Sequence, residues 1–167
     1  NVKVLGYKAI ATPSWVINQM SGSTFIECDF GAGAEVANAS WRCLSIAPPS
    51  GGNIDSLFFE KCVMNFPTGD DAPGCLDIDF SNDEIGTVSF VQCNFELSTD
   101  YAVRIHNTSG TGGFAKGITF DKCRMTILQT KSAPSLLIEN PNDTEIHNLT
   151  IQNCLISSGR GPAISIT

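Results

Sequence analysis

A phrase centred on a cysteine recurs five times along this chain of 167 residues, at intervals of about thirty residues. Each copy has a bulky apolar residue three places before the cysteine and another apolar residue two places after it. The copies read STFIECDF, LFFEKCVM, VSFVQCNF, ITFDKCRM and LTIQNCLI, with the cysteines at Cys28, Cys62, Cys93, Cys123 and Cys154. Spacings of 34, 31, 30 and 31 residues are typical of a repeat architecture in which each repeat is one structural unit.

The apolar residues of each phrase alternate with other residues, and then the alternation is broken by one extra position before the cysteine. Alternation with a period of two, in segments rich in Phe, Ile and Val, predicts a β-strand. The extra position predicts a bend that joins two short strands. Each phrase is therefore expected to form a strand, a bend and a second strand.

A second strand family lies between the phrases, bounded by Gly, Pro, Asn and Asp. Its members read CLSIA, CLDIDF, AVRIHN, LLIEN and AISIT, and they align on Ile46, Ile78, Ile105, Ile138 and Ile166. The opening segments VKVLGY and SWVIN fit as a degenerate first phrase and its partner strand. The pattern predicts an all-β fold of about six coils of roughly thirty residues, whose like strands stack in parallel at about 4.8 Å per coil.

The phrase Phe-x-x-Cys-x-Phe, with Asn or Lys before the cysteine as in IQNCLI and FDKCRM, resembles the single-stranded right-handed parallel β-helix of pectate lyases, polygalacturonases and phage tailspikes. The resemblance covers essentially the whole chain and implies one β-helix domain over residues 1–167. Because neither end carries a helical or charged cap, we expect a segment of a longer chain. This fold hosts lyases, hydrolases and adhesins, so it does not determine the activity.

The cysteines of the phrases are expected to stack inside the solenoid as small, soft hydrophobic side chains. A metal or redox array of thiols is disfavoured, because the column contains no histidine or carboxylate and faces the apolar core. Cys43 and Cys75 lie in adjacent coils within reach of a disulfide, but we expect them to remain thiols. Mostly free thiols are typical of folding in a reducing compartment, which suits a phage protein assembled in bacterial cytoplasm. We predict no metal and no cofactor.

The charge and hydropathy of the chain exclude two classes of partner. Seventeen acidic residues against ten basic ones give a formal net charge of −7, and no cluster of Lys and Arg is present. Nucleic-acid binding is therefore not expected. No apolar run approaches the roughly eighteen residues that a membrane helix requires, so membrane insertion is not expected either.

Outward positions of the second strand family gather the candidate chemistry. A residue between two inward positions of a strand points outward. Three successive coils therefore place five polar side chains on one patch, namely Asp77, Asp79, Arg104, His106 and Glu139. The resemblance implies the same location, because the catalytic groups of pectate lyases and polygalacturonases project from the outer face of such a sheet.

The spacing of two carboxylates on this patch suits glycoside hydrolysis. Asp79 and Glu139 are two coils apart, roughly 9–10 Å between backbones, and an inverting glycosidase separates its carboxyl groups by about 6.5–9.5 Å. We predict one of them as the general acid and the other as the base, with Asp77 as a further candidate catalytic carboxylate. His106 and Arg104 are predicted to hold the sugar.

Two aromatic residues at the entry to the same sheet, Trp41 and Tyr101, are predicted to offer sugar rings a stacking platform. In a lyase, the carboxylates would instead bind Ca²⁺ bridged to an acidic sugar, and Arg104 would abstract the proton. A plain ladder of mixed charges, or sugar binding without catalysis, is the remaining alternative.

We therefore expect a tailspike or tail-fibre segment in the phage virion that binds and cleaves a bacterial capsule or O-antigen polysaccharide. The alternative is a non-catalytic structural rod or adhesin, located extracellularly. We also expect a homotrimer, since five outward positions are apolar, namely Ile26, Phe58, Val63, Val91 and Leu155.

Overall fold

The structure of the chain is a computed structural model, and it describes residues 15–30, 42–65, 74–107, 113–140 and 146–167. The described residues form strands and turns, and none of them is helical. Every strand pairing among them is parallel. The predicted opening phrase at residues 2–7 and the predicted platform residue Trp41 lie outside the described residues.

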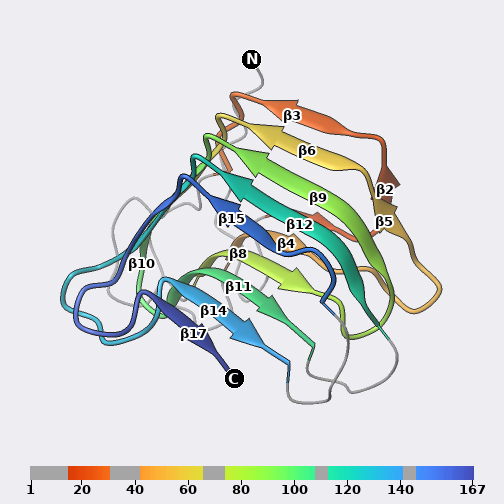
Figure 1. The fold of residues 1–167 in the computed structure, drawn as a ribbon. Coiled ribbons are helices and arrows are strands. Elements are labelled where there is room, and N and C mark those ends of the chain that lie inside the picture. The colour runs from red at the N-terminus through yellow and green to blue at the C-terminus, as the bar shows by residue number, and fades with distance from the viewer. Residues whose placement is uncertain (1–14, 31–41, 66–73, 108–112, 141–145) are drawn as a thin grey trace.

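The strands belong to three sheets, which the chain visits in the same order in every turn (Figure 1). Sheet I consists of β1 (Trp15–Ile17), β4 (Arg42–Ile46), β8 (Gly74–Asp79), β11 (Tyr101–His106), β14 (Leu136–Glu139) and β17 (Ile164–Ile166). Sheet II consists of β2 (Met20–Ser21), β3 (Thr24–Ile26), β5 (Ile54–Asp55), β6 (Leu57–Glu60), β9 (Ile85–Val91), β12 (Ala115–Asp121) and β15 (Thr150–Gln152). Sheet III consists of β7 (Val63–Asn65), β10 (Asn94–Ser98), β13 (Arg124–Ile127) and β16 (Leu155–Ser157).

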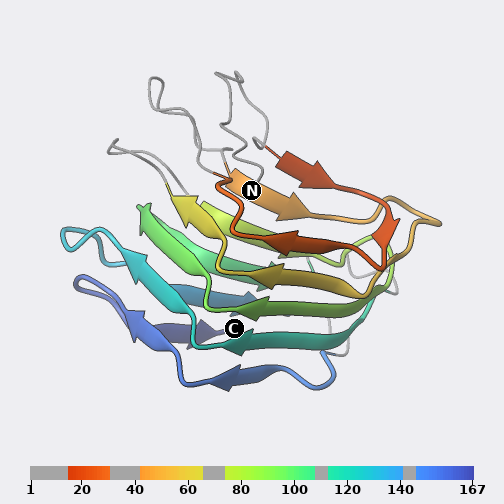
Figure 2. The same ribbon diagram turned by 90° about the horizontal axis from the view of Figure 1, so that it is seen from above.

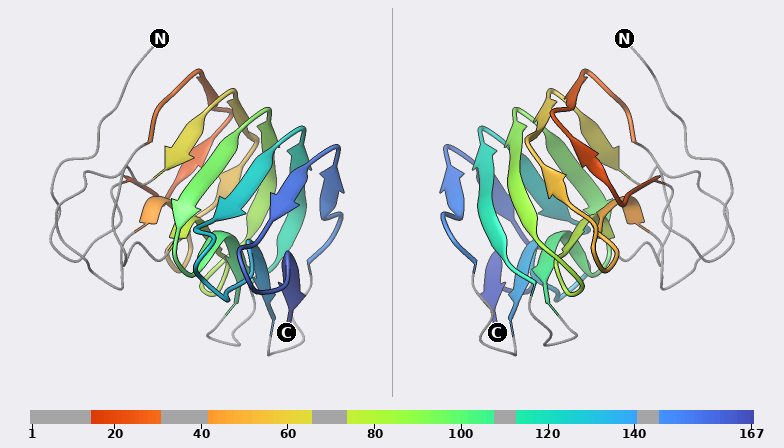
Figure 3. Two further views of the ribbon diagram at one scale, coloured as in Figure 1. Left: turned by 90° about the vertical axis from the view of Figure 1, so that its left-hand side faces the viewer. Right: turned by 90° about the vertical axis from the view of Figure 1, so that its right-hand side faces the viewer.

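Neighbouring strands in each sheet come from consecutive turns, so the chain forms a parallel β-solenoid. Among the described residues, four turns carry a strand in each of the three sheets, and they are the turns that contain β7, β10, β13 and β16. Strands β1, β2 and β3 precede these turns, and β17 follows them. Figure 2 shows the turns following one another in chain order, and Figure 3 shows them from the two sides of the molecule. The predicted all-β parallel solenoid is therefore confirmed.

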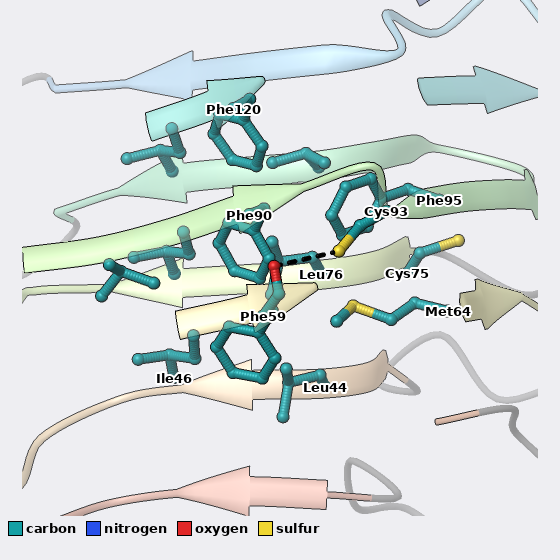
Figure 4. Close-up of a cluster of buried hydrophobic side chains, with 14 of the residues drawn as sticks. Leu44, Ile46, Phe59, Met64, Cys75, Leu76, Phe90, Cys93, Phe95 and Phe120 are labelled. Atoms are coloured by element: carbon teal, nitrogen blue, oxygen red, sulfur yellow. Dashed lines mark hydrogen bonds between the residues drawn. The ribbon is translucent and has the colours of Figure 1, made fainter. Parts of the chain in front are cut away.

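The phrase residues form the core where sheets II and III meet. The rings of Phe25, Phe59, Phe90 and Phe120 stack with successive centroid separations of 4.7, 4.7 and 5.1 Å, which is close to the spacing of paired strands. The Cys93 thiol donates a hydrogen bond to the carbonyl oxygen of Phe59 in the preceding turn, at 3.5 Å (Figure 4). The thiols of Cys62, Cys123 and Cys154 make the corresponding bond with the phenylalanine one turn earlier.

The predicted bend is present in every phrase, at the residue immediately before the cysteine. This residue has a left-handed backbone, with φ between 52° and 55°, at Glu27, Lys61, Gln92, Lys122 and Asn153. Such a conformation is uncommon for residues other than glycine. The strand pairing continues through the bend, because the backbone N–H of Lys61, for example, donates to the Val91 carbonyl at 2.9 Å. The bend turns the chain from sheet II into sheet III.

The predicted inward positions of sheet I are buried in the inner turns, and this set is Leu44, Ile46, Leu76, Ile78, Phe80, Val103, Ile105, Leu136 and Ile138. Ile164 and Ile166 are exposed, because their strand β17 is paired with β14 alone among the described strands. All seven cysteines are free thiols, including the buried pair Cys43 and Cys75. The cysteine column is a packing column, as the sequence predicts. Within it, hydrogen bonds to the thiols of Cys123 and Cys62, together with burial, raise the pKa of Cys93.

Candidate functional site

Strands β8, β11 and β14 are neighbours in sheet I, and their register aligns the predicted polar residues. Arg104 lies opposite Asp77, and His106 lies opposite Asp79 on one side and Glu139 on the other. The order Asp79, His106, Glu139 across three strands is the column that the isoleucine alignment predicts. The structure therefore brings these five predicted side chains onto one sheet face.

Asp77 is the centre of this cluster. Its Oδ1 accepts a hydrogen bond from the Tyr101 hydroxyl at 3.2 Å, and His106 Nε2 lies 3.2 Å from the same carboxylate. The Arg42 Nε lies 3.9 Å from Oδ1, and only 14% of the Asp77 side chain is exposed. A carboxylate withdrawn from water to this degree requires such partners to remain charged.

The surroundings of Asp77 favour its ionised form. Burial alone raises the pKa of Asp77, but the hydrogen bond with His106 and the charges of His106, Arg42 and Arg104 together hold that pKa below its ordinary value. Burial, followed by the negative charge of Asp77, raises the pKa of Tyr101, so this phenol remains protonated and donates its hydrogen bond. At neutral pH the cluster therefore contains a fixed carboxylate.

Tyr101 is buried among cationic side chains. The guanidinium carbon of Arg42 lies 5.1 Å from the centroid of its ring, and that of Arg104 lies 5.8 Å from it. Below the ring lies Gly74, where an added Cβ would be 2.1 Å from the Tyr101 Cε2, so only glycine allows this packing. Tyr101, which the sequence predicts as a stacking residue, is therefore buried, with only 4% of it exposed.

Asp79 and Glu139 are the two carboxylates at the surface of the cluster, with 26% and 30% of their side chains exposed. Asp79 accepts a hydrogen bond from the Ser81 backbone N–H at 2.9 Å. Glu139 accepts one from the Arg104 Nε at 2.5 Å. Burial alone lowers the pKa of Arg104, but this hydrogen bond and the charge of Asp77 together raise it above its ordinary value.

His106 lies between the carboxylates and is more enclosed than an outward position predicts, since only 6% of its side chain is exposed. Its Nδ1 is buried, lies 3.8 Å from the Asp79 Oδ1, and has no hydrogen-bond partner among the described residues. The ring therefore lies between the carboxylates of Asp77 and Asp79.

Arg42 belongs to the Asp77 cluster, although sequence reasoning did not include it. It lies two positions before the inward Leu44 and directly opposite Gly74 in the next turn, and it contacts both Asp77 and the Tyr101 ring. The signal in the sequence was the alignment of Arg42 with Gly74 and then Tyr101, where a glycine leaves room for side chains of both neighbouring turns.

No family model, no curated protein and no solved structure matches this chain. Within the described residues, no group of three or more His, Cys, Asp or Glu side chains is placed to hold a metal ion. The same part of the chain contains no helix long and apolar enough to cross a membrane.

Proposed function

We propose that the outer face of sheet I binds a bacterial surface polysaccharide, a capsule or an O-antigen, and that the chain is a tailspike-like segment. One observation carries this proposal, namely the convergence of two arginines, a histidine and three carboxylates on neighbouring strands. Guanidinium and carboxylate groups donate and accept paired hydrogen bonds in fixed directions, which suits the vicinal hydroxyls of a sugar. The contacts of Asp77 hold these groups in place before a ligand arrives, which lowers the entropy lost on binding.

The proposal includes cleavage by Asp79 and Glu139. Their strands are separated by β11, so the backbones are about 9–10 Å apart, near the separation of roughly 6.5–9.5 Å at which two carboxyl groups admit a sugar and a water. Both are partly exposed, and one would protonate the leaving oxygen while the other activates the water. Asp77 would hold His106 and the arginines rather than exchange a proton, because its pKa is low.

We further propose that the chain winds as a right-handed β-helix of six coils and assembles as a homotrimer in a virion tail. The repeated bend, the phrase period and the parallel register support the β-helix. The exposed apolar side chain of Ile26 supports an interface on the outer face of sheet II.

A non-catalytic rod is the second candidate, and the contacts of Asp77 favour it. A carboxylate already held by Tyr101, His106 and Arg42 also serves as a device that fastens adjacent turns of the sheet. A lyase is less well supported, because Arg104 binds Glu139 and its raised pKa opposes the role of a base.

The test is to incubate the chain with a panel of capsular and O-antigen polysaccharides and to identify the products by mass spectrometry. Glu139→Gln and Asp79→Asn are compared with Glu60→Gln, whose carboxylate is similarly exposed and ion-paired, but on sheet II. Saturated oligosaccharides that the first two variants lose and the third retains would support hydrolysis. Unsaturated products would favour the lyase, binding without products would favour the rod or adhesin, and the absence of binding would refute the proposal.

A further inference from the structure

A groove of about 430 Å³ lies on sheet III, on a different face from the Asp77 cluster. It runs across β10, β13 and β16 and the turns that follow the last two. Its lining includes Glu96, Arg124, Thr126, Gln129, Leu155 and Ser157. This volume is within the usual range of small-ligand sites, about 300–1,000 Å³.

The floor of the groove consists of outward strand positions that the register aligns. Arg124 lies opposite Leu155, and Thr126 lies opposite Ser157. Alternation within β13 places Met125 in the core and Arg124 and Thr126 outside. The floor therefore presents a cation, an aliphatic side chain and two hydroxyls in a fixed arrangement.

The rim of the groove is held by close backbone packing between the turns after β13 and β16. An added Cβ at Gly159 would lie 2.4 Å from the Gln129 carbonyl oxygen, so a larger residue would separate the two turns. The backbone N–H of Arg160 donates to the Lys131 carbonyl at 2.9 Å, which fixes their stacking. The groove is thus shaped by backbone contacts before any ligand binds.

The polar groups of the groove are balanced in charge. The Arg124 Nε lies 3.0 Å from the Glu96 Oε1, and Arg124, which lines the groove, carries further guanidinium N–H groups that can act as donors. Leu155 is 56% exposed beside this pair. A ligand with one apolar face and an edge of hydroxyls would satisfy all of these groups together.

We propose that this groove is a second carbohydrate site, which takes one neutral pyranose unit. The C–H face of the ring packs on Leu155, and two neighbouring hydroxyls bond with Arg124 and Glu96, one accepting and one donating. A carboxylate on the sugar would face the negative charge of Glu96, so a uronate binds less tightly. The ligand class rests on the proposed function, whereas the groove itself does not.

The experiment is a ¹H–¹⁵N correlation spectrum of the native chain, titrated separately with galactose, glucose, N-acetylglucosamine, rhamnose and glucuronate. We expect saturable shifts of the Arg124 Nε–H and of the Thr126 and Ser157 amides with at least one neutral sugar, and weaker shifts with glucuronate. Arg124→Gln should weaken that binding about tenfold, since hydrogen bonds to charged groups are the stronger ones. Thr126→Val should weaken it less, and the matched control Thr119→Val, an outward threonine of sheet II, should leave it unchanged.

Each result decides between the two sites, because the amides of Asp77, Asp79, Arg104, His106 and Glu139 report on sheet I in the same spectra. Shifts at the groove with a silent sheet I would support this inference and count against the proposed function. Shifts on sheet I alone would overturn this inference and leave the proposed function standing. Stronger binding of glucuronate, or a titration that Arg124→Gln does not change, would also overturn the neutral-sugar site.

Discussion

The inside of the solenoid and the outer face of sheet I follow opposite rules. Inside, the same residue types return in every turn, and Phe59, Phe90 and Phe120 stack on one another. On the outer face of sheet I, the residue type at each aligned position changes from turn to turn. Asp77 and Arg104 lie opposite one another, and both contact Tyr101. Repetition therefore marks the positions that stabilise the fold, and departure from repetition marks the positions where specific contacts are built.

The outer face of sheet II shows that departure from repetition is not inevitable on a surface. One of its outward columns contains Ser89, Thr119 and Thr150, which are small and uncharged, whereas the neighbouring column contains Glu60, Val91, Asp121 and Gln152. A surface required only for solubility and strand pairing needs no more than this. The charged cluster on sheet I is thus a local addition, and the variants below separate it from the repeated core.

The largest effect is expected from Phe90→Ala in the aromatic stack. Removing a fully buried ring between Phe59 and Phe120 should lower the free energy of unfolding by about 3–5 kcal/mol. Urea denaturation followed by circular dichroism measures the change. Phe58→Ala, at the outward position next to Phe59, should lower the free energy of unfolding by about 1 kcal/mol. Equal losses in the two variants would show that the inward position contributes no more to stability than the outward one.

Asp77→Asn should give the second largest effect. It leaves Arg42 and Arg104 without their shared carboxylate, and we expect a loss of about 2 kcal/mol at neutral pH, below the 3–5 kcal/mol of a fully buried pair.

The same variant should change the pH dependence of stability. Because the native pKa of Asp77 is lowered, its contribution is complete above the ordinary aspartate pKa near 3.9 and is lost as the pH falls through the native value. Denaturation between about pH 2 and pH 7 should show a shallower acid limb in Asp77→Asn than in Glu60→Gln. Parallel acid limbs in the two variants would mean that the cluster does not hold Asp77 ionised.

Thiol chemistry should distinguish the enclosed part of the cysteine column from its half-buried member. Cys154 is the one cysteine of the seven that is not buried, so it should react with an aromatic disulfide reagent before the others. The absorbance of the released reagent thiolate should correspond to about one fast thiol per chain, and to the remaining thiols only after unfolding. Cys154→Ser should abolish the fast phase, and a fast phase that persists in this variant would contradict the packing of the column.

The smallest effect is expected from Thr119→Val on the outer face of sheet II. The side chain keeps its branched shape and lies at an outward strand position, so the free energy of unfolding should change by less than about 0.5 kcal/mol. Thermal denaturation measures this. A loss as large as that of Asp77→Asn would show that sheet II also carries specific contacts.

Much of the fold was predictable from the sequence, because the period of the cysteine phrase sets which residues lie side by side. The bend before Cys93, the parallel register and the column from Asp79 to Glu139 all follow from that period. The burial of His106 and Tyr101 does not, because it depends on how far long side chains reach across strands. Arg42 joins the cluster because it lies opposite Gly74, which has no side chain. The groove at Arg124 depends on how two turns stack. The period of the phrase predicts neither feature.

The most direct test of the division between fold and function is the affinity of the Arg104→Gln variant for a polysaccharide that the native chain binds. Isothermal titration compares it with Arg160→Gln, an arginine in an exposed turn. We predict that Arg104→Gln binds about tenfold more weakly, since it loses hydrogen bonds from a charged group, and that Arg160→Gln binds as the native chain does. Native affinity in Arg104→Gln would contradict the assignment of binding to the outer face of sheet I.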